Sequence, residues 1–403
     1  MGLDRERNNI LKRFVYADNA ATTKVLPEVR DVMMPFFDEV YGNPSSAYSK
    51  GAEAASPLMQ ARETIASLLG AKTTEIFFTA SGSEADNWAI KGAAQANAKK
   101  GRHIISSKFE HHAVLHALES LERDGFEVTY VDVNKNGVID PADVEKAIRP
   151  DTTLIAIMMA NNEIGTIQPI KEIAAIGKAH GVTVFTDAVQ AVGNMPVNVK
   201  ELGVDMLSLS GHKIHAPKGI GVLYIRTGTR CRTLIDGGGQ ERGRRGGTEN
   251  VAFAVALAKA LEIATARLSD MARVKAMRDR LMNTLLDKIP YAHVNGDTDR
   301  RLAGNLNMTF ECVEGESLLM WLDASGICAS TGSACNSASL EPSHVLLSIG
   351  VPVEHAHGSL RFSLSHENTE EDVDHIIQTL PVIVQRLRDM SPLYNSTMAR
   401  VKE

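Results

Sequence analysis

Long hydrophobic runs are missing from this chain of 403 residues, and neither sign of charge dominates it. No apolar stretch approaches the roughly 20 residues that a membrane-spanning helix needs. Residues 1–14 are charged and are not followed by the apolar core of a signal peptide. We therefore expect a cytoplasmic protein. Acidic and basic residues are mixed along the chain and give a net charge of -6, which argues against nucleic acid as a partner.

Cysteine is also scarce, with only Cys231, Cys312, Cys328 and Cys335 in the whole chain. Their irregular spacing fits neither a disulfide framework nor the paired cysteines of a zinc site, so we expect no metal. Cys312 and Cys328 have apolar neighbours and are predicted to lie in the core. Cys335 lies within the small polar residues STGSACNSAS, which is typical of an accessible loop. Because most cysteines are buried, an exposed Cys335 favours a nucleophile.

Apolar strands alternate with amphipathic helices through the first part of the chain, which predicts an α/β domain with a mostly parallel sheet. The predicted strands lie at 75–79, 104–106, 127–133, 154–159, 182–185, 206–209 and 221–225. Two early helices are predicted, one over 26–40 after Pro27 and one from about Pro57 to 69. A long helical region at about 251–289 then leads into a smaller α+β domain with strands at 305–310 and 359–364. The length of the chain also favours two domains. We expect a large cofactor-binding domain over 16–260 and a small domain formed by 1–15 and 261–403.

Polar residues follow three successive predicted strands, at the sheet edge where ligands of such folds bind. They include Asn162, Asp187, Gln190, Ser210, His212 and Lys213. Such a set matches the needs of pyridoxal phosphate: a lysine for a Schiff base, an acid for the ring nitrogen, and hydroxyls for the phosphate. Lys213 ends an apolar run, where partial desolvation lets an amine lose its proton more easily. For Asp187 alone, a helix cap or a surface carboxylate remains the alternative.

Two further loops and two single residues could contact such a cofactor or its substrate. The small residues 80–84 join a strand to a helix and could bind an anion, although a capped helix without a ligand is equally compatible. The glycine-rich and arginine-rich stretch 236–250 could approach a ligand or be a mobile surface loop. His111 could stack on a ring, although a single histidine is more often a structural hydrogen-bonding residue. Arg361, costly to bury alone, predicts a carboxylate from the substrate or a neighbour.

Several of these segments together resemble a cysteine desulfurase of the NifS/IscS type, in the aminotransferase class V group of pyridoxal phosphate enzymes. The similarity covers residues 16 to about 392. Its most specific segments are GNPSS (42–46), ANNEIG (160–165), TDAVQ (186–190), SGHKIHAPKG (210–219), GQERGRRGGTEN (239–250) and STGSACNSASLEPSH (330–344). The resemblance implies the type I fold of pyridoxal phosphate transferases, with a large domain and a smaller α+β domain.

The resemblance also implies that Lys213, Cys335 and His111 are catalytic. Lys213 would carry the cofactor as a Schiff base and take the α-proton of L-cysteine. Cys335, as a thiolate, would attack the substrate sulfur, so that a persulfide stays on the enzyme and L-alanine leaves. An iron–sulfur scaffold or another sulfur-acceptor protein would then receive the sulfur. A selenocysteine lyase or another class V enzyme is the alternative, and such enzymes lack the mobile Cys335 loop.

The same resemblance assigns binding roles to the remaining residues. His111 would stack on the cofactor ring and Asp187 would pair with its nitrogen. Asn162 and Arg361 would bind the substrate, with Arg361 on its carboxylate. The other cofactor contacts would come from Asn162, Gln190, Gly82, Ser83, Ser210 and His212, and from Thr248 of the other subunit of a homodimer.

Overall fold

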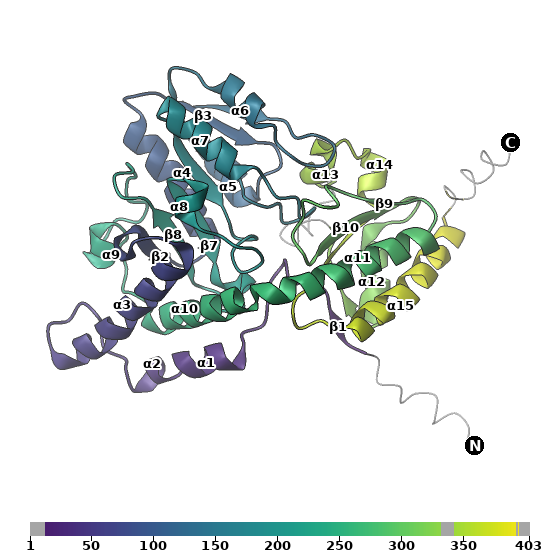
Figure 1. Ribbon diagram of the computed structural model, residues 1–403, viewed down its shortest axis with the longest axis horizontal. Coiled ribbons are helices and arrows are strands. Elements are labelled where there is room, and N and C mark those ends of the chain that lie inside the picture. The colour runs from purple at the N-terminus through teal and green to yellow at the C-terminus, as the bar shows by residue number, and fades with distance from the viewer. Residues whose placement is uncertain (1–12, 332–341, 392–393, 395–403) are drawn as a thin grey trace.

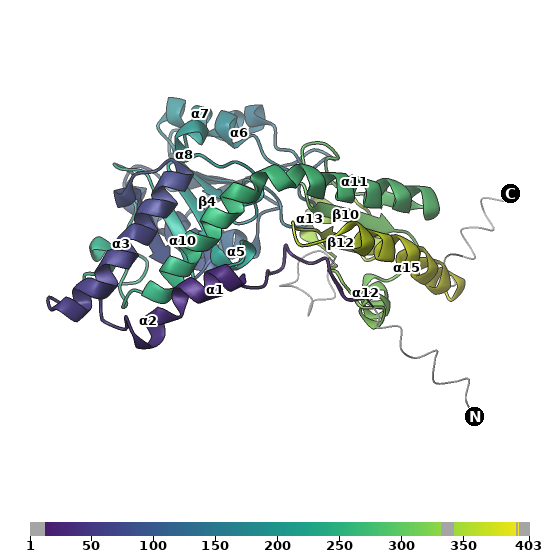
Figure 2. The ribbon, with the colours of Figure 1, turned by 60° about the horizontal axis from the view of Figure 1, so that its bottom comes forward.

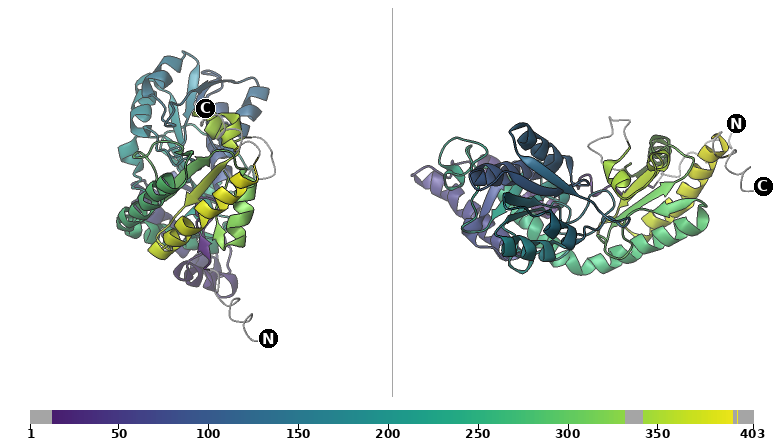
Figure 3. Two further views of the ribbon diagram at one scale, coloured as in Figure 1. Left: turned by 90° about the vertical axis from the view of Figure 1, so that its right-hand side faces the viewer. Right: turned by 90° about the horizontal axis from the view of Figure 1, so that it is seen from above.

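The computed structural model describes residues 13–331, 342–391 and 394 of the chain. Figure 1 shows two bodies, a larger one built on a seven-stranded sheet and a smaller one built on a three-stranded sheet. Seen from above in Figure 3, the two bodies lie side by side and are joined along one edge by a helical segment. None of the helices in these described ranges is both long and apolar enough to cross a bilayer.

The larger sheet has the strand order β2-β8-β7-β6-β5-β3-β4. Strand β8 runs antiparallel to both of its neighbours and the other strands run parallel to one another. The strands are β2 (Ile76–Thr79), β3 (His103–Ser107), β4 (Glu127–Val131), β5 (Thr152–Ala156), β6 (Thr183–Asp187), β7 (Met206–Ser210) and β8 (Gly221–Ile225). The predicted mostly parallel sheet is therefore present. Because β5, β6 and β7 are parallel neighbours, the residues that follow them meet at one edge.

Helices cover the larger sheet and bury its apolar residues in two clusters. One cluster lies under α4 (Gly82–Asn97) and α5 (His112–Arg123) and includes Phe77, Trp88 and Leu118. The other lies under α1 (Pro27–Met33), α3 (Ser49–Leu69), α7 (Ile170–His180) and α10 (Val251–Ala266). Short helices complete this part: α2 (Pro35–Asp38), α6 (Pro141–Ala147), α8 (Val199–Leu202), α9 (Gln240–Gly243) and the 3-10 turns η1 (Thr73–Glu75) and η2 (Gly211–Lys213).

The smaller body has the antiparallel strand order β12-β10-β9, and its core includes Phe310, Leu318, Phe362 and Ile376. Figure 2 shows α11, α12 and α15 gathered around this sheet. Its strands are β9 (Ala292–Val294), β10 (Asn305–Phe310) and β12 (Ser359–Ser363). Its helices are α11 (Met271–Lys288), α12 (Gly315–Ala324), α13 (His344–Ser348), α14 (Val353–Ala356) and α15 (Glu370–Asp389).

Several predicted helix boundaries were wrong, and proline explains part of the error. The predicted helix over 26–40 is split into α1 and α2 at Pro35, which has no N–H to continue the first helix. The predicted start at Pro57 is too late, because α3 begins at Ser49 and contains this proline. The predicted long helical region over 251–289 is present as α10 and α11, which the 3-10 turn η3 (Arg267–Asp270) joins between the two bodies.

Two cysteines predicted to lie in the core, Cys312 and Cys328, are only partly buried. Cys312 lies just after β10 in the left-handed backbone region, with a φ of 64°, which is typical of a turn and not of a core strand. Cys328 lies in β11 (Ile327–Cys328), a two-residue strand whose only pairing, among the described residues, is with β1 (Val15–Tyr16). Apolar neighbours in the sequence did not determine the burial of either thiol.

The N-terminal segment links the two bodies. β1 pairs with β11, and Asp18 forms an isolated bridge with Ser363, so residues 15–18 lie against the smaller body. It then crosses to the larger body, where the amide of Thr23 donates to the carbonyl of His212 at 2.9 Å. Residues 19–22, the crossing segment, therefore pass directly beside Lys213.

A buried ion pair anchors the glycine-rich and arginine-rich stretch to the larger body. The guanidinium of Arg62 donates to both oxygens of Glu241 at 2.7 Å, and the amide of Phe78 donates to the same carboxylate at 3.1 Å. Glu241 and Arg242 have φ values of 46° and 60°, a costly conformation for residues with side chains. Because Glu241 is buried, the interpretation of 236–250 as a mobile surface loop is wrong for this residue.

We expect Glu241→Ala to lower the free energy of unfolding by about 3–5 kcal/mol, because it leaves the buried Arg62 guanidinium unpaired. Asp143→Ala is the matched control, because it removes a carboxylate that pairs with Lys146 at the surface. The control should change stability by less than about 1 kcal/mol. Urea unfolding of both variants measures the difference, and equal losses would contradict the prediction.

Candidate active site

A cavity of about 740 Å³ lies where β5, β6 and β7 end, and all the predicted site residues except Thr248 and Cys335 line it. The larger body supplies most of its wall and β12 of the smaller body supplies Arg361. The lining residues are Ala20, Ala21, Ser81, Gly82, Ser83, Asp86, His111, Met158, Asn162, Asp187, Val189, Gln190, Ser210, His212, Lys213 and Arg361.

Lys213 follows β7 at the end of the tight turn η2. The turn can form because residue 211 is glycine, where a Cβ atom would come within 2.8 Å of the Ile220 side chain. The Lys213 ammonium donates to the carbonyl oxygens of Ala20 at 2.5 Å and Ala21 at 2.7 Å. The crossing segment therefore holds this amine at the cavity wall.

Asp187 ends β6 and is buried, with 5% of its surface exposed. Burial raises the pKa of its carboxyl to about 6, although the Val189 amide, which donates to it at 2.9 Å, and the nearby Lys213 charge both lower it. A buried carboxylate gains most from a cationic partner, because the partner offsets the cost of burying its charge. Asp187 is thus suited to a protonated ring nitrogen.

Asp86, which the sequence analysis missed, lies in the same wall. The Ser208 hydroxyl donates to its Oδ1 at 2.5 Å, and Ser208 is paired with Asp187 between β7 and β6. Burial, followed by the nearby Asp187 charge, raises the pKa of Asp86 well above its usual value. The available signal was an acidic residue on a helix face that is otherwise apolar, between the buried Ala85 and Ala89.

The N-terminus of α4 forms one end of the cavity. Ser81 caps the helix, because its hydroxyl accepts from the Glu84 amide at 3.0 Å. At Gly82 a Cβ atom would lie 2.9 Å from the Val189 side chain and 3.1 Å from that of Ser210, so glycine permits the close approach. Helix N-termini of this kind bind phosphate through free backbone amides. The structure therefore shows the helix cap of the alternative interpretation, and it places residues 81–83 at the cavity, as the anion-binding interpretation requires.

Two neutral histidines flank this end. The Nδ1 atom of His111 accepts from the Ala113 amide at 3.1 Å, so the proton of the neutral ring is on Nε2. Burial, then the charges of His112 and Lys213, lower the pKa of His111 to about 4. Burial, then Lys213, likewise lower the pKa of His212 to about 4. Both rings are thus uncharged at neutral pH and can stack or donate one hydrogen bond each.

Arg361 is buried, and its neighbours satisfy only part of its guanidinium. Nη1 donates to the Asn162 carbonyl at 2.9 Å and Nη2 donates to Asp18 at 2.8 Å. The buried Nε atom has no hydrogen-bond partner among the described residues. The predicted carboxylate partner is thus present as a neighbour, Asp18, and the Nε–H is not satisfied by any acceptor of the described residues.

Of the predicted site residues that the structure describes, Thr248 does not reach this cavity. Thr248 is exposed and lies outside the lining set. Cys335 lies outside the described residues. In the part of the chain that the structure does describe, no group of three or more His, Cys, Asp or Glu side chains is arranged to hold a metal ion.

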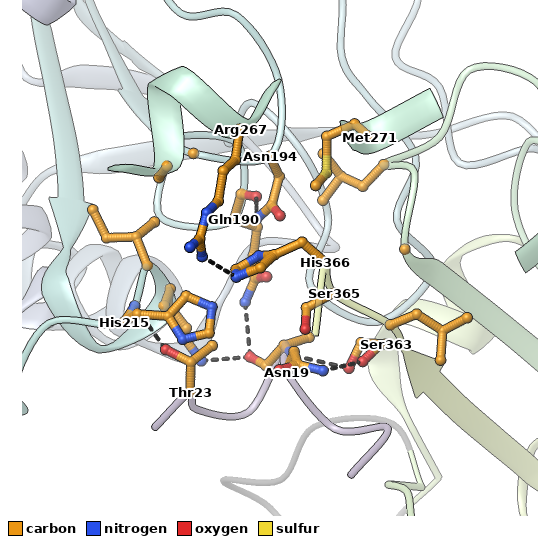
Figure 4. Close-up of a pocket in the computed structure, with 18 of the residues that line it drawn as sticks. Asn19, Thr23, Gln190, Asn194, His215, Arg267, Met271, Ser363, Ser365 and His366 are labelled. Carbon is orange, nitrogen blue, oxygen red and sulfur yellow. Dashed lines mark hydrogen bonds between the residues drawn. The ribbon is translucent and has the colours of Figure 1, made fainter. Parts of the chain in front are cut away.

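A second cavity, of about 730 Å³, shares Ala20, Gln190 and Lys213 with the first. Figure 4 shows Arg267 pointing toward His366, with His215 beside the same ring. The guanidinium lies 2.5 Å from Nε2 of His366, and the two imidazole rings meet edge to face at 5.0 Å. Burial, then the charges of His215 and Arg267, lower the pKa of His366 to about 4, so its ring is neutral and accepts this hydrogen bond.

We expect His366 to make the fold less stable as the pH falls from 6.5 toward 4, because the unfolded chain binds a proton in this window and the folded chain does not. His366→Gln keeps an acceptor for Arg267 but does not titrate. The parent should therefore lose about 1 kcal/mol more stability than His366→Gln between pH 7 and pH 5, a value discounted because the ring is half-buried. Urea unfolding at both pH values tests this, and equal losses would refute it.

Proteins of known sequence or structure are similar to this chain over most of its length. The aminotransferase class-V family matches residues 15–376. A protein named cysteine desulfurase IscS from Methanosarcina thermophila is 57% identical over 380 residues, which cover 94% of each chain. A solved NifS-like protein has a TM-score of 0.88 at 40% identity, covering 93% of this chain and all of the other. A structure of SspA in complex with cysteine has a TM-score of 0.78 at 37% identity, covering 88% and 100%.

Proposed function

We propose that this chain, which belongs to the aminotransferase class V family as a pyridoxal phosphate-dependent cysteine desulfurase, transfers the sulfur of L-cysteine to Cys335 as a persulfide. One observation supports this most: a single cavity contains an amine, a buried acid, a neutral imidazole and a partly unpaired guanidinium. These groups are Lys213, Asp187, His111 and Arg361.

The residues around the cavity fit pyridoxal phosphate. The N-terminus of α4, with Gly82 and Ser83, and the side chains of Ser210 and His212 would hold the phosphate. Asp187 would pair with the ring nitrogen. Lys213 would hold the aldehyde carbon, and the remaining cofactor contacts would come from His111, Asn162 and Gln190. When bound, the cofactor supplies an electron sink for the carbon atoms of the amino acid.

The substrate end of the cavity is cationic. Arg361 would bind the carboxylate of L-cysteine through its unpaired Nε edge, together with Asn162, whose carbonyl already orients the guanidinium. Lys213 would move the α-proton, since its amine lies at the cavity wall on two carbonyl oxygens. His111 would stay neutral and present a flat ring face.

The transfer of sulfur from L-cysteine to Cys335 requires no external oxidant. The thiolate of Cys335 forms a bond to the substrate sulfur, and the bond between that sulfur and the β-carbon breaks. The electron pair of the broken bond stays with carbon, which gains a proton, so that L-cysteine and the thiol become L-alanine and a persulfide. The persulfide sulfur can then pass to an iron–sulfur scaffold or another sulfur-acceptor protein in the cytoplasm.

A homodimer is part of the proposal, because exposed apolar side chains gather near α1, α2 and α3. Met34, Phe37, Tyr41 and Tyr48 are all exposed in the described chain. The helices α1, α2 and α3 lie at the lower left of Figure 1. Burying such a patch is favourable for association. Thr248, exposed on the stretch that Glu241 anchors to α3, would then contact the phosphate in the partner's cavity.

We also propose the division into domains that the sequence suggested. Residues 16–260 would form the cofactor-binding domain. Residues 1–15 and 261–403 would form the domain that carries Cys335. The separate apolar core around the three-stranded sheet supports this division.

Cys335→Ala should keep the absorption of the bound cofactor and lose persulfide formation, because it removes the sulfur acceptor and no cavity residue. Mass spectrometry of alkylated protein after addition of L-cysteine detects the persulfide, and alanine release measures turnover. Cys231→Ala is the control, since burial raises the pKa of that thiol to about 12 and leaves it inert. Desulfuration of cysteine by Cys335→Ala at the parent rate would refute the proposal.

Arg361→Gln should weaken binding of L-cysteine by about 10- to 100-fold, because a charged hydrogen bond to the carboxylate contributes about 1.5–3 kcal/mol. Binding is measured from the change in cofactor absorbance on addition of cysteine. Arg267→Gln, at the second cavity, is the matched control and should bind within about threefold of the parent. Equal affinities for Arg361→Gln and the parent would contradict the assignment of Arg361.

A further inference from the structure

The turn that follows β5, residues 161–165, is rigid. The Asn161 side chain accepts from the amides of Glu163 at 2.8 Å and Ile164 at 3.0 Å, and its carbonyl accepts from Gly165 at 3.0 Å. Gly165 has a φ of 75°, and a Cβ atom there would lie 2.6 Å from the Asn305 side chain. This turn of the larger body is therefore packed directly against the smaller body.

Two neighbouring carbonyls of the turn are bound by residues of the smaller body. Arg361 donates to the carbonyl of Asn162, while Asn305 and Asn307 donate to that of Glu163 at 3.1 Å and 3.3 Å. Asn307 and Arg361 are directly opposite each other in the pairing of β10 with β12. The turn and the arginine proposed to bind the substrate are thus held as one unit.

The carboxylate of Glu163 makes a separate contact with the start of α13. Glu163 is 1% exposed, and the Ser343 hydroxyl donates to its Oε2 at 2.5 Å. Ser343 is the capping residue of α13, because the same hydroxyl oxygen accepts from the Leu346 amide at 3.2 Å. His344, the next residue, lies 3.0 Å from the carbonyl of Glu110. The beginning of α13 is therefore fixed to the wall of the cavity.

The chain on the other side of Cys335 is fixed to the same unit. Ser330 and Arg361 exchange backbone hydrogen bonds, of 3.1 Å from the Ser330 amide and 2.6 Å from the Arg361 amide. Cys335 lies between Ser330 and Ser343 in the sequence. Both flanking residues are therefore tied to the substrate end of the cavity, Ser330 through Arg361 and Ser343 through Glu163.

We propose that Glu163 is a positioning residue for sulfur transfer, because its carboxylate holds Ser343 and thereby one end of the chain that carries Cys335. The inference rests on the proposed role of Cys335. A nucleophile on a chain tied at both ends is confined near its target, which raises its effective concentration. Loss of the Glu163 contact leaves this end held by His344 and the buried side of α13, so it loosens the end and slows the attack without changing the groups that bind the substrate.

The test compares Glu163→Ala, Ser343→Ala and Glu163→Gln as purified proteins with bound cofactor. Single-turnover reactions with L-cysteine follow persulfide formation on Cys335 by mass spectrometry, and the cofactor absorbance reports cysteine binding separately. We expect the two alanine variants to form persulfide about 10- to 100-fold more slowly while binding cysteine within about threefold of the parent. Glu163→Gln keeps an acceptor for Ser343 and should form persulfide within about threefold of the parent rate.

Glu75→Ala is the matched control, because Glu75 is also a buried carboxylate and accepts from Lys72 and Thr227 away from the cavity. It should lose stability without slowing the transfer. Parent-like transfer in Glu163→Ala would overturn the inference, as would equally slow transfer in Glu163→Gln or a loss of cysteine binding as large as the loss of rate. A parent protein that forms no persulfide on Cys335 would overturn the proposed function, and this inference with it.

Discussion

The guanidinium of Arg361 is the interaction on which the arrangement of this molecule depends. It is almost fully buried, and its partners come from two separate segments: Asp18 of the N-terminal segment and the Asn162 carbonyl of the larger body. A buried arginine without such partners would cost several kcal/mol. Satisfying it therefore holds the smaller body, the N-terminal segment and the cavity wall in one geometry.

The second constraint is the free energy that is needed to bury several carboxyl groups together at one end of a parallel sheet. Asp86, Glu110 and Asp187 are buried near one another, and burial is the main reason that the pKa of each is raised. Two of them are stabilised by serine hydroxyls at 2.5 Å, from Ser208 and Ser107. A cationic ring nitrogen would offset part of this cost. A positively charged group beside Asp187 would therefore favour the ionised form of its carboxyl.

Sequence reasoning predicted the sheet and ten of the residues that line the cavity. Polar residues after three strands are a local signal and indicated six of them: Asn162, Asp187, Gln190, Ser210, His212 and Lys213. The roles of Gly82, Ser83, His111 and Arg361 depended on the family resemblance. Sequence reasoning missed Asp86 and Asp18. The partners of these residues, Ser208 and Arg361, are 122 and 343 positions away in the chain. It also misjudged two helix ends: the helix predicted over 26–40 is split at Pro35, whereas α3 begins at Ser49 and contains Pro57. The connection of Glu163 to Ser343 has no signal in the local sequence.

The sequence by itself determined which chemical groups are present and on which strands and turns they lie. The strands β5, β6 and β7 are buried on both faces, and the residues at the end of each strand then lie at the sheet edge. Only the tertiary structure decided which of these groups are charged, which are paired and which remain free to bind a ligand. The physical reason is that pKa values and hydrogen-bond partners depend on burial and on distances between segments far apart in the chain, as for Arg361 and Asp18.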